Sequence, residues 1–442
     1  MGKNIMLLFI CSTWLNVSAQ QNWTLKQCID YGQKNNRNNI IYANEKRAAD
    51  AKAKEALADY LPRVSLTATL DDNLKLQQTV IPAGAFGPDD VKISMSKQFS
   101  SNASAQLDQV IYDGALLKGL KANKYNLRQA DLNVQQSREA IIYNISTAYF
   151  QIFVYHQQLQ LLQFNKGTYE KQIEIYRLQV SKGTALQKDL DKVNVDYNNT
   201  ISQIRVARSN LQLAENELKY EMGYPINEAL SVDASKDVSI SPSNGDSTRT
   251  FSPASRVDYQ LSELKIKALE IEQSRIKAQA LPKLSAYARY GAVGFGDNLK
   301  QSYGELLPFS TVGLKLNIPI LDFYKRNAQY RQANINRVNA QEKLKLSEGQ
   351  YRVEYDNAYT KLQQSTANVE NDRRNITLAE SVFKVTDLQF QKGTTDLTDW
   401  LNTQHSLRET QSNYLNSLYN YYLARIDVEK AAGTLSTFYN SL

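Results

Sequence analysis

The sequence has very little cysteine and histidine. Among its 442 residues there are 2 Cys and 2 His, and only Cys28 lies outside an apolar N-terminal segment. Metal sites built from Cys and His clusters need more of these residues, as do catalytic Cys–His pairs and disulfides. No phosphate-binding loop and no nucleophile elbow are found either. We therefore expect no metal, no cofactor and no enzymatic activity.

Long blocks of one charge are also missing. The 52 Lys+Arg and 45 Asp+Glu residues give a net charge of +7 and are mixed along the chain, so no nucleic-acid partner is expected. Glycine (18) and proline (9) are scarce. Few turns are therefore available, and the helices and strands must be long.

The first residues have the features of a secretory signal. Lys3 precedes an apolar run, and Val17-Ser18-Ala19 provides small residues for cleavage, so residues 1–19 are expected to be a signal peptide. No later segment approaches the ~18 continuous apolar residues of a membrane-spanning helix. The sequence predicts an exported chain without a helical anchor.

Short motifs recur about 210 residues apart. Lys182-Gly183-Thr184 returns as Lys392-Gly393-Thr394, and Leu61-Pro62 returns as Leu281-Pro282. We interpret the chain as an internal duplication. The expected segments are a first repeat 20–223, a linker or equatorial region 224–253, a second repeat 254–435 and a C-terminal tail 436–442.

Each repeat is predicted to contain a helix, a β-hairpin and a pair of long helices. In the first repeat, a capping box of Thr24 and Gln27 is expected to begin a helix that runs to about Leu61 and stops at Pro62. The proline-free segment 115–181 predicts one continuous long helix.

The hairpins are expected at 63–112 and 283–320, because apolar and polar residues alternate there with a period of two. The helix pairs turn at 182–184 and 392–394. Their returning helices carry large side chains every seven residues, which is typical of supercoiled helices.

Two amphipathic hairpins on an exported chain point to an outer-membrane β-barrel. Four strands cannot close a barrel, and unpaired strand edges are prohibitive in lipid, so the chain must oligomerise. Three copies would give 12 strands and a lumen. We therefore predict an α+β membrane protein: a trimeric 12-stranded β-barrel, four strands per chain, continued by a long α-helical periplasmic tunnel. A soluble sheet with plain coiled coils, a periplasmic scaffold without a pore, is the alternative.

Several motifs resemble the TolC family of outer-membrane efflux ducts across nearly the whole processed chain. They are Trp23-Thr24-Leu25-Lys26-Gln27-Cys28, Arg256-Val257-Asp258-Tyr259 with Val257 in place of the family's proline, Asp399-Trp400-Leu401 and Ala432-Gly433-Thr434-Leu435. The resemblance implies a homotrimer in the outer-membrane lipid of a Gram-negative bacterium, extending into the periplasm. It also implies a periplasmic adaptor protein and an inner-membrane pump as partners.

The implied function is the duct of a tripartite efflux system that exports small toxic molecules. A duct for type I protein secretion is the alternative, since fold alone does not separate the two cargoes. In the family, the turns between the long helices form the tip that contacts the adaptor. That implies contact by Gly183, Thr184, Gly393 and Thr394. Each glycine is also explained as a helix C-cap that needs positive φ.

The resemblance further implies a gate at the periplasmic entrance. The family has two aspartate rings there; the first falls on Asp399, but the second falls on Asn402, so one carboxylate ring is expected. Asp189 matches an aspartate that latches the closed tip against an arginine, which Thr395 replaces here. The alternative for Asp399 is helix capping, with Asp396 as the N-cap and Asp399 at the third position.

Overall fold

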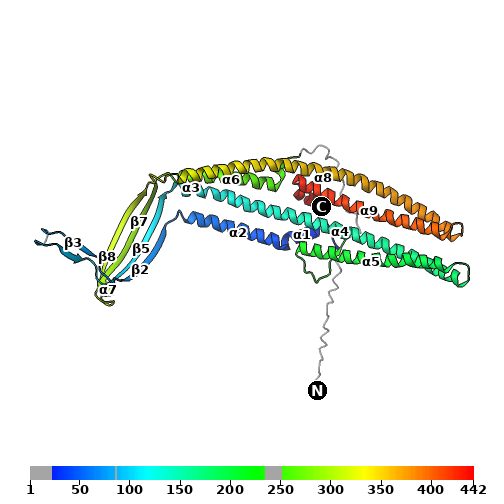
Figure 1. The fold of residues 1–442 in the computed structure, drawn as a ribbon, viewed down its shortest axis with the longest axis horizontal. Coiled ribbons are helices and arrows are strands. Elements are labelled where there is room, and N and C mark those ends of the chain that lie inside the picture. Colours follow the sequence, from blue (N-terminus) through cyan, green and yellow to red (C-terminus); the bar gives the residue numbers. More distant parts are fainter. Residues whose placement is uncertain (1–21, 85–86, 234–250) are drawn as a thin grey trace, which may run out of the picture. The chain divides into compact units, whose positions relative to one another are not determined.

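The computed structural model describes residues 22–84, 87–233 and 251–442. The expected signal peptide and residues 234–250 of the expected linker lie outside this range. The described chain is mostly helical with a few β-strands (Figure 1). Within the described segments, every helix is too short or too polar to cross a membrane.

Two compact units divide the chain differently from the predicted repeats. One unit comprises residues 1–41, 135–257 and 348–442, and the other comprises 42–134 and 258–347. Each unit therefore takes segments from both repeats. The long helices α4 (Ala122–Ser181) and α8 (Lys325–Gln391) each contribute to both units.

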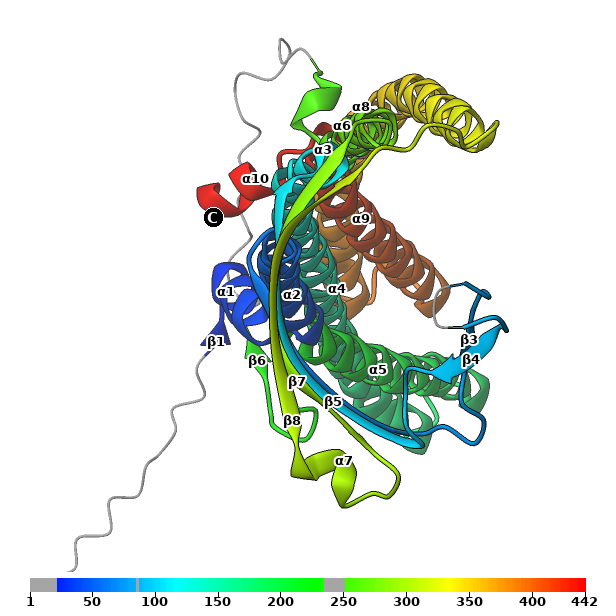
Figure 2. The ribbon, with the colours of Figure 1, turned by 90° about the vertical axis from the view of Figure 1, so that its left-hand side faces the viewer.

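A four-stranded antiparallel sheet forms the centre of the second unit. Its order is β2-β5-β7-β8, and Figure 2 shows the strands curving together as one strip. The bounds are β2 Arg63–Asp72, β5 Phe99–Tyr112, β7 Lys283–Gly296 and β8 Leu306–Asn317. β2 pairs with β5 and β7 pairs with β8, as alternation in the sequence predicted. Among the described strands, β2 and β8 have no second partner.

The first half of the hairpin predicted at 63–112 is not one continuous strand. β2 stops at Asp72, and β3 (Gln78–Ile81) pairs with β4 (Val91–Ser94) in a separate two-stranded sheet. Asn73 ends the main ladder, because its side-chain amide donates to the carbonyls of Lys97 and Gln98 at 3.1 and 3.3 Å. An asparagine that bonds to nearby backbone favours such a break.

The sheet has two chemically different faces, fixed by its register. Val64, Leu107, Ala288 and Val312 form one cross-strand row. They belong to the apolar face, and the residues one position along belong to the polar face, since side chains alternate along a strand. The next row on the polar face contains Ser65, Gln106, Arg289 and Thr311. Pro308 fits in β8 because β8 is an edge strand.

Helices continue from the strands within the same unit. Asp113 caps α3 (Gly114–Leu120) by accepting hydrogen bonds from the amides of Ala115 and Leu116. The helix breaks at Lys121 before α4 begins, so the predicted continuous helix from 115 is two helices. The unit also holds most of α2 (Arg37–Ala58), most of α6 (Val257–Ala278) and the short α7 (Gln301–Gly304).

The first unit contains the long helix pairs and the main core. Its remaining helices are α1 Leu25–Asn35, α5 Gln187–Met222, α9 Leu397–Ala432 and α10 Leu435–Ser441, with the 3₁₀ turn Pro253–Ser255. Inside this core the ring of Phe150 of α4 stacks on the ring of Tyr422 of α9, with the two centroids 4.5 Å apart. β1 (Asn22–Trp23) and β6 (Ser231–Val232) form a short parallel pair.

The first helix differs from its prediction. Thr24 and Gln27 form the expected capping box, but the single helix predicted up to Leu61 is divided at Asn36. Asn36 is extended (φ −61°, ψ 129°) and donates its side-chain amide to the Glu221 carbonyl at 2.7 Å. A partner 185 residues away therefore fixes the break, which local sequence patterns do not reveal.

Candidate functional site

Two turns at the ends of the long helix pairs carry the predicted adaptor-contact residues. The first joins α4 to α5 and the second joins α8 to α9. In each turn a threonine donates its N–H, at 2.9 Å, to the carbonyl five residues earlier: Thr184 to Gln179 and Thr394 to Gln389. Each threonine hydroxyl donates to the same carbonyl at 3.0 Å. The two turns thus end their helices with one hydrogen-bond pattern, a Schellman-type cap.

The glycine of each turn is required by backbone conformation. Gly183 and Gly393 both have φ of +70°, a region that costs a residue with a Cβ atom ~1–2 kcal/mol. Nothing lies within 4 Å of the position that a Cβ would take, so sterics from neighbours add nothing. The C-cap interpretation is confirmed. All four turn residues are exposed in this chain, and their contact with an adaptor stays a prediction.

An aromatic cluster behind the turns holds the four helices together. Trp400 of α9 is fully buried, and its indole N–H donates to Asp387 of α8 at 2.8 Å. The rings of Tyr169, Phe383 and Phe390 surround it with centroids 5.8 to 6.0 Å away. The cluster also includes Leu190 and Val193 of α5. Both turns therefore lie at the same end of this helix bundle (Figure 1).

The predicted gate residue Asp399 lies in the first turn of α9. Asp396 is the N-cap and accepts the Asp399 amide at 2.8 Å, so the predicted capping arrangement is present. The Asp399 carboxylate is exposed and accepts the Thr395 hydroxyl at 2.8 Å. Asn402 is also exposed and lies on the same helical face, three residues further along. Capping uses the backbone of Asp399 and leaves its carboxylate available to solvent.

Asp189 forms an ion pair within its own helix, and its place in a latch stays a prediction. Its carboxylate pairs with Lys192 of the same helix at 3.3 Å, while Thr395 donates to Asp399 instead. Burial, together with the negative charges of Asp189 and Asp396, raises the pKa of Tyr176 to about 12. Asp189 and Asp396 thus both lie near the Tyr176 phenol, although they come from the starts of two different helices, α5 and α9.

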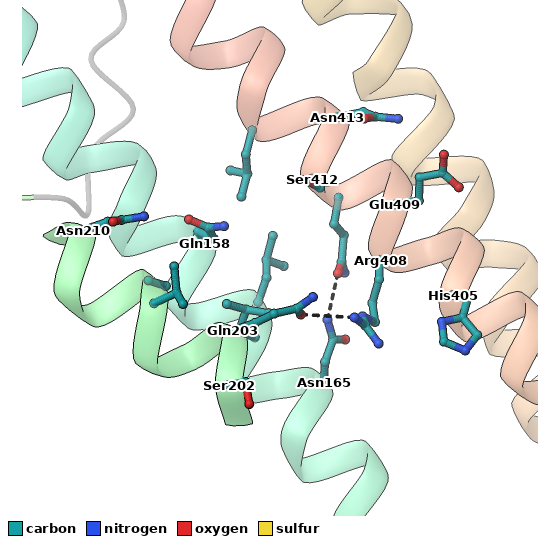
Figure 3. Close-up of a pocket in the computed structure, with 16 residues that line it drawn as sticks. Gln158, Asn165, Ser202, Gln203, Asn210, His405, Arg408, Glu409, Ser412 and Asn413 are labelled. Atoms are coloured by element: carbon teal, nitrogen blue, oxygen red, sulfur yellow. Dashed lines mark hydrogen bonds between the residues drawn. The ribbon is translucent and has the colours of Figure 1, made fainter. Parts of the chain in front are cut away.

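A cavity of about 650 Å³ lies further along the bundle, between α4, α5 and α9. Figure 3 shows polar side chains from all three helices around it, including Asn165, Gln203 and Arg408. Arg408 donates to Gln203 at 3.1 Å and to the Tyr169 hydroxyl at 3.3 Å. His405 contacts the carboxylate of Asp196 at 3.2 Å. Hydrogen bonds therefore connect the helix pairs of the two halves of the chain.

Beside this cavity lies a buried polar layer that sequence analysis missed. It consists of Asn165, Gln404 and Gln411, which are exposed by 1%, 1% and 5%. The Asn165 amide donates to Gln411 at 3.0 Å and accepts from Gln404 at 3.2 Å. Gln404 and Gln411 each follow a heptad residue by four positions, Trp400 and Leu407. That spacing marks the second core position of a heptad and could have identified them.

A groove of about 760 Å³ runs beside the turns, between α4 and α8. Its walls include the apolar residues Phe164, Ile175 and Phe390, and Phe164 is 65% exposed. Gln172 also lines it, and its buried Oε1 has no hydrogen-bond partner among the described residues. The groove thus combines exposed apolar surface with an unused acceptor.

Known proteins are similar to this chain in sequence and in fold. The TolC outer membrane protein of Escherichia coli is 24% identical over 349 residues, 76% of this chain and 70% of that protein. The alkaline protease secretion protein AprF of Pseudomonas aeruginosa is 21% identical over 75% of this chain and 69% of its own. The structure of the Campylobacter jejuni CmeC outer membrane channel matches with a TM-score of 0.73 at 15% identity, over 94% of this chain and 88% of that one.

The family described as outer membrane efflux protein matches the chain twice, over residues 41–223 and again over residues 256–434. The two matches together span most of the sequence and contain both long-helix turns. The chain therefore belongs to the outer membrane efflux protein family, the outer-membrane ducts of efflux and secretion systems.

Proposed function

We propose that this chain forms the outer-membrane duct of a tripartite efflux system and exports small toxic molecules from the periplasm, or from an inner-membrane pump, to the exterior. The duct is passive, and an inner-membrane partner supplies the transport energy. The observation that carries this proposal is the four-stranded sheet, which has one apolar face, one polar face and two unpaired edges.

The sheet supports a trimeric barrel of 12 strands. Its apolar face exposes Leu66, Val312 and Leu314 by 78%, 84% and 69%. In a sheet surrounded by water, such large apolar side chains would be covered by another layer of the protein. Unpaired backbone groups at β2 and β8 would be costly in lipid unless the next copy pairs with them. Three copies close such a barrel, with the apolar faces toward lipid and the polar faces toward the lumen.

The helices support a tunnel built from the same three copies. α5 exposes Val206 and Leu213, and α8 exposes Leu378 and Val385, by 54 to 66%. In each pair the residues are seven positions apart, the spacing of a coiled-coil seam without a partner. A neighbouring copy would supply the missing helix. The matching turns and the double family match also support the internal duplication, with repeats at 20–223 and 254–435.

The tip supports gating and adaptor contact. Three copies of the exposed Asp399 around one axis would form a carboxylate ring that favours cations, with Asn402 adding a neutral polar ring. Gly183, Thr184, Gly393 and Thr394 would contact an adaptor, and the groove beside Gln172 offers its helices an apolar surface. In place of the family's arginine latch, the Thr395–Asp399 hydrogen bond braces the entrance of α9, while Asp189 supports α5.

Two experiments test the proposal. Reconstituted protein should give discrete conductance steps in a planar bilayer, and their absence would reject the pore in favour of a periplasmic scaffold. Deleting the gene should sensitise cells to dyes, detergents, bile salts or antibiotics, and the intact gene should restore growth. The similarity to AprF, named as a secretion protein, keeps a second function open. Unchanged growth together with a protein missing from the culture supernatant would favour secretion.

A further inference from the structure

Charge is unevenly distributed along the polar face of the sheet. Near the ends of the strands that join the helices, this face carries Arg63, Arg289, Lys315 and Asp108. These residues occupy three successive rows on that face, a length of about 13 Å. The rows beyond Arg289 hold serine, threonine, asparagine, glycine and apolar residues, and Asp71 is their one charged member.

The cations of this basic band are exposed and form no ion pair with another described residue. No ion pair of Arg63, Arg289 or Lys315 is found within residues 22–84, 87–233 and 251–442, and all three are exposed. Lys283, in the next row, differs because it pairs with Asp113 at 2.9 Å. With Asp108 as the one carboxylate, the band has a net of two positive charges per chain.

A hydrogen-bonded relay positions the central cation. The Arg289 guanidinium donates twice to Gln106 Oε1, at 3.0 and 2.7 Å. The Gln106 amide in turn donates to both Asp108 oxygens, at 2.8 and 3.0 Å. Asp108 is thus directed toward an amide rather than toward Arg289, and the positive charge of Arg289 is not cancelled by direct contact.

Two aromatic rings near the band lie against the polar face of the sheet instead of projecting from it. A Cβ on Gly313 would lie 2.7 Å from the Tyr287 ring, and a Cβ on Gly291 would lie 2.9 Å from the Phe309 ring. Both are directly opposed pairs of β7 and β8. Each ring therefore covers a glycine instead of extending from the face, and Arg289 and Lys315 are the long side chains that project there.

We infer that Arg63, Arg289 and Lys315 form a positively charged ring that selects anions in the barrel lumen. The inference depends on the proposed trimeric duct, which would gather six net positive charges within about 13 Å of its length. A wall of one sign raises the local concentration of counter-ions. The duct then favours small anionic molecules in its barrel section, opposite in sign to the carboxylates at the proposed tip gate.

The test measures ion selectivity of the full-length protein in planar bilayers under a KCl gradient. Salt is kept near 0.1 M, where the Debye length of about 10 Å leaves the charges of the band incompletely screened. All variants are made in an Asp399→Ala parent, so that the carboxylates at the tip do not set the selectivity. Arg63→Gln, Arg289→Gln and Lys315→Gln together should lower the chloride-to-potassium permeability ratio at least about threefold. Asp108→Asn, which removes the one carboxylate, should raise the ratio.

A charge-preserving control separates charge from shape. Arg63→Lys, Arg289→Lys and Lys315→Arg together replace each cationic side chain, including the guanidinium that donates to Gln106, but keep the charge of the band. The ratio should therefore stay at the parental value. An unchanged ratio in the glutamine variant, with conductance retained, overturns the inference and leaves the duct intact. If the glutamine variant does not insert into the bilayer, Asp108→Asn alone provides the test. In that case an unchanged chloride-to-potassium permeability ratio overturns the inference. A parent without conductance refutes the proposed duct and the inference with it.

Discussion

Single residues at the tip follow local rules that can be recognised in the sequence. Gly183 and Gly393 were identified as helix ends from a repeated Lys-Gly-Thr motif, and both adopt left-handed φ. The capping role of Asp396 was also predictable, because it precedes Asp399 by three residues in the sequence. The partner of Thr395 was not predictable, because a hydroxyl has several acceptors within reach and only the turn geometry selects Asp399.

Replacing a turn glycine should loosen the tip. Gly393→Ala forces a Cβ into φ of +70° and should cost about 1–2 kcal/mol of local stability. Hydrogen exchange at the amides of Gly393 and Thr394 measures this loss. Gly349→Ala is the matched control, because Gly349 lies inside α8 with open space around it. That variant should instead stabilise its helix by about 1 kcal/mol. Equal exchange in both variants would contradict the conformational argument.

The charge of Asp399 should affect ion selectivity. Asp399→Ala removes the proposed carboxylate ring but keeps the Asp396 cap, so cation selectivity should fall while the helix persists. The reversal potential across a salt gradient measures the change. Asp399→Glu keeps the charge and should behave as the wild type. If the alanine variant has the wild-type reversal potential, Asp399 is not part of the gate.

At the scale of helices, the seven-residue repeat predicted packed and supercoiled pairs. Its members Leu190, Trp400 and Leu407 are buried, as a packed seam requires, and supercoiling stays a prediction. The repeat did not reveal the polar layer of Asn165, Gln404 and Gln411. Polar residues are usually assigned to the surface. These would have been recognised only if the second core position of the heptad had been examined as well. A polar layer in an apolar seam favours one alignment of neighbouring helices over its competitors.

Removing one member of the polar layer should be worse than removing all three. Asn165→Ala leaves Gln404 and Gln411 buried without partners and should destabilise the bundle by about 1–3 kcal/mol. The combined variant Asn165→Leu, Gln404→Leu and Gln411→Leu replaces the layer by apolar packing and should be near neutral or stabilising. Thermal unfolding of the purified protein compares the two. A combined variant less stable than the single one would contradict this account.

At the scale of the whole molecule, the two faces of the sheet have meaning only in the proposed assembly. Leu314→Arg places a charge on the apolar face and should cost about 2–4 kcal/mol near the bilayer midplane, reducing the amount of trimer in outer-membrane fractions. Thr311→Arg, on the polar face of the same strand, should be tolerated. Equal loss of trimer in both variants would mean that the faces are not lipid and lumen.

The sequence by itself determined the elements and their chemistry. Hydrophobic period identified the strands and long helices, and scarce glycine and proline located the turns, because these signals act over a few neighbouring residues. Tertiary structure decided what depends on distant partners. It divided the first helix at Asn36 through Glu221, ended the main ladder at Asn73 through Lys97 and Gln98, and joined Asn165 to Gln411 across 246 residues. It also paired β5 with β7, and this pairing places Arg63, Arg289 and Lys315 on one face of a single sheet. β5 and β7 lie far apart in the sequence, so no local pattern fixes their pairing.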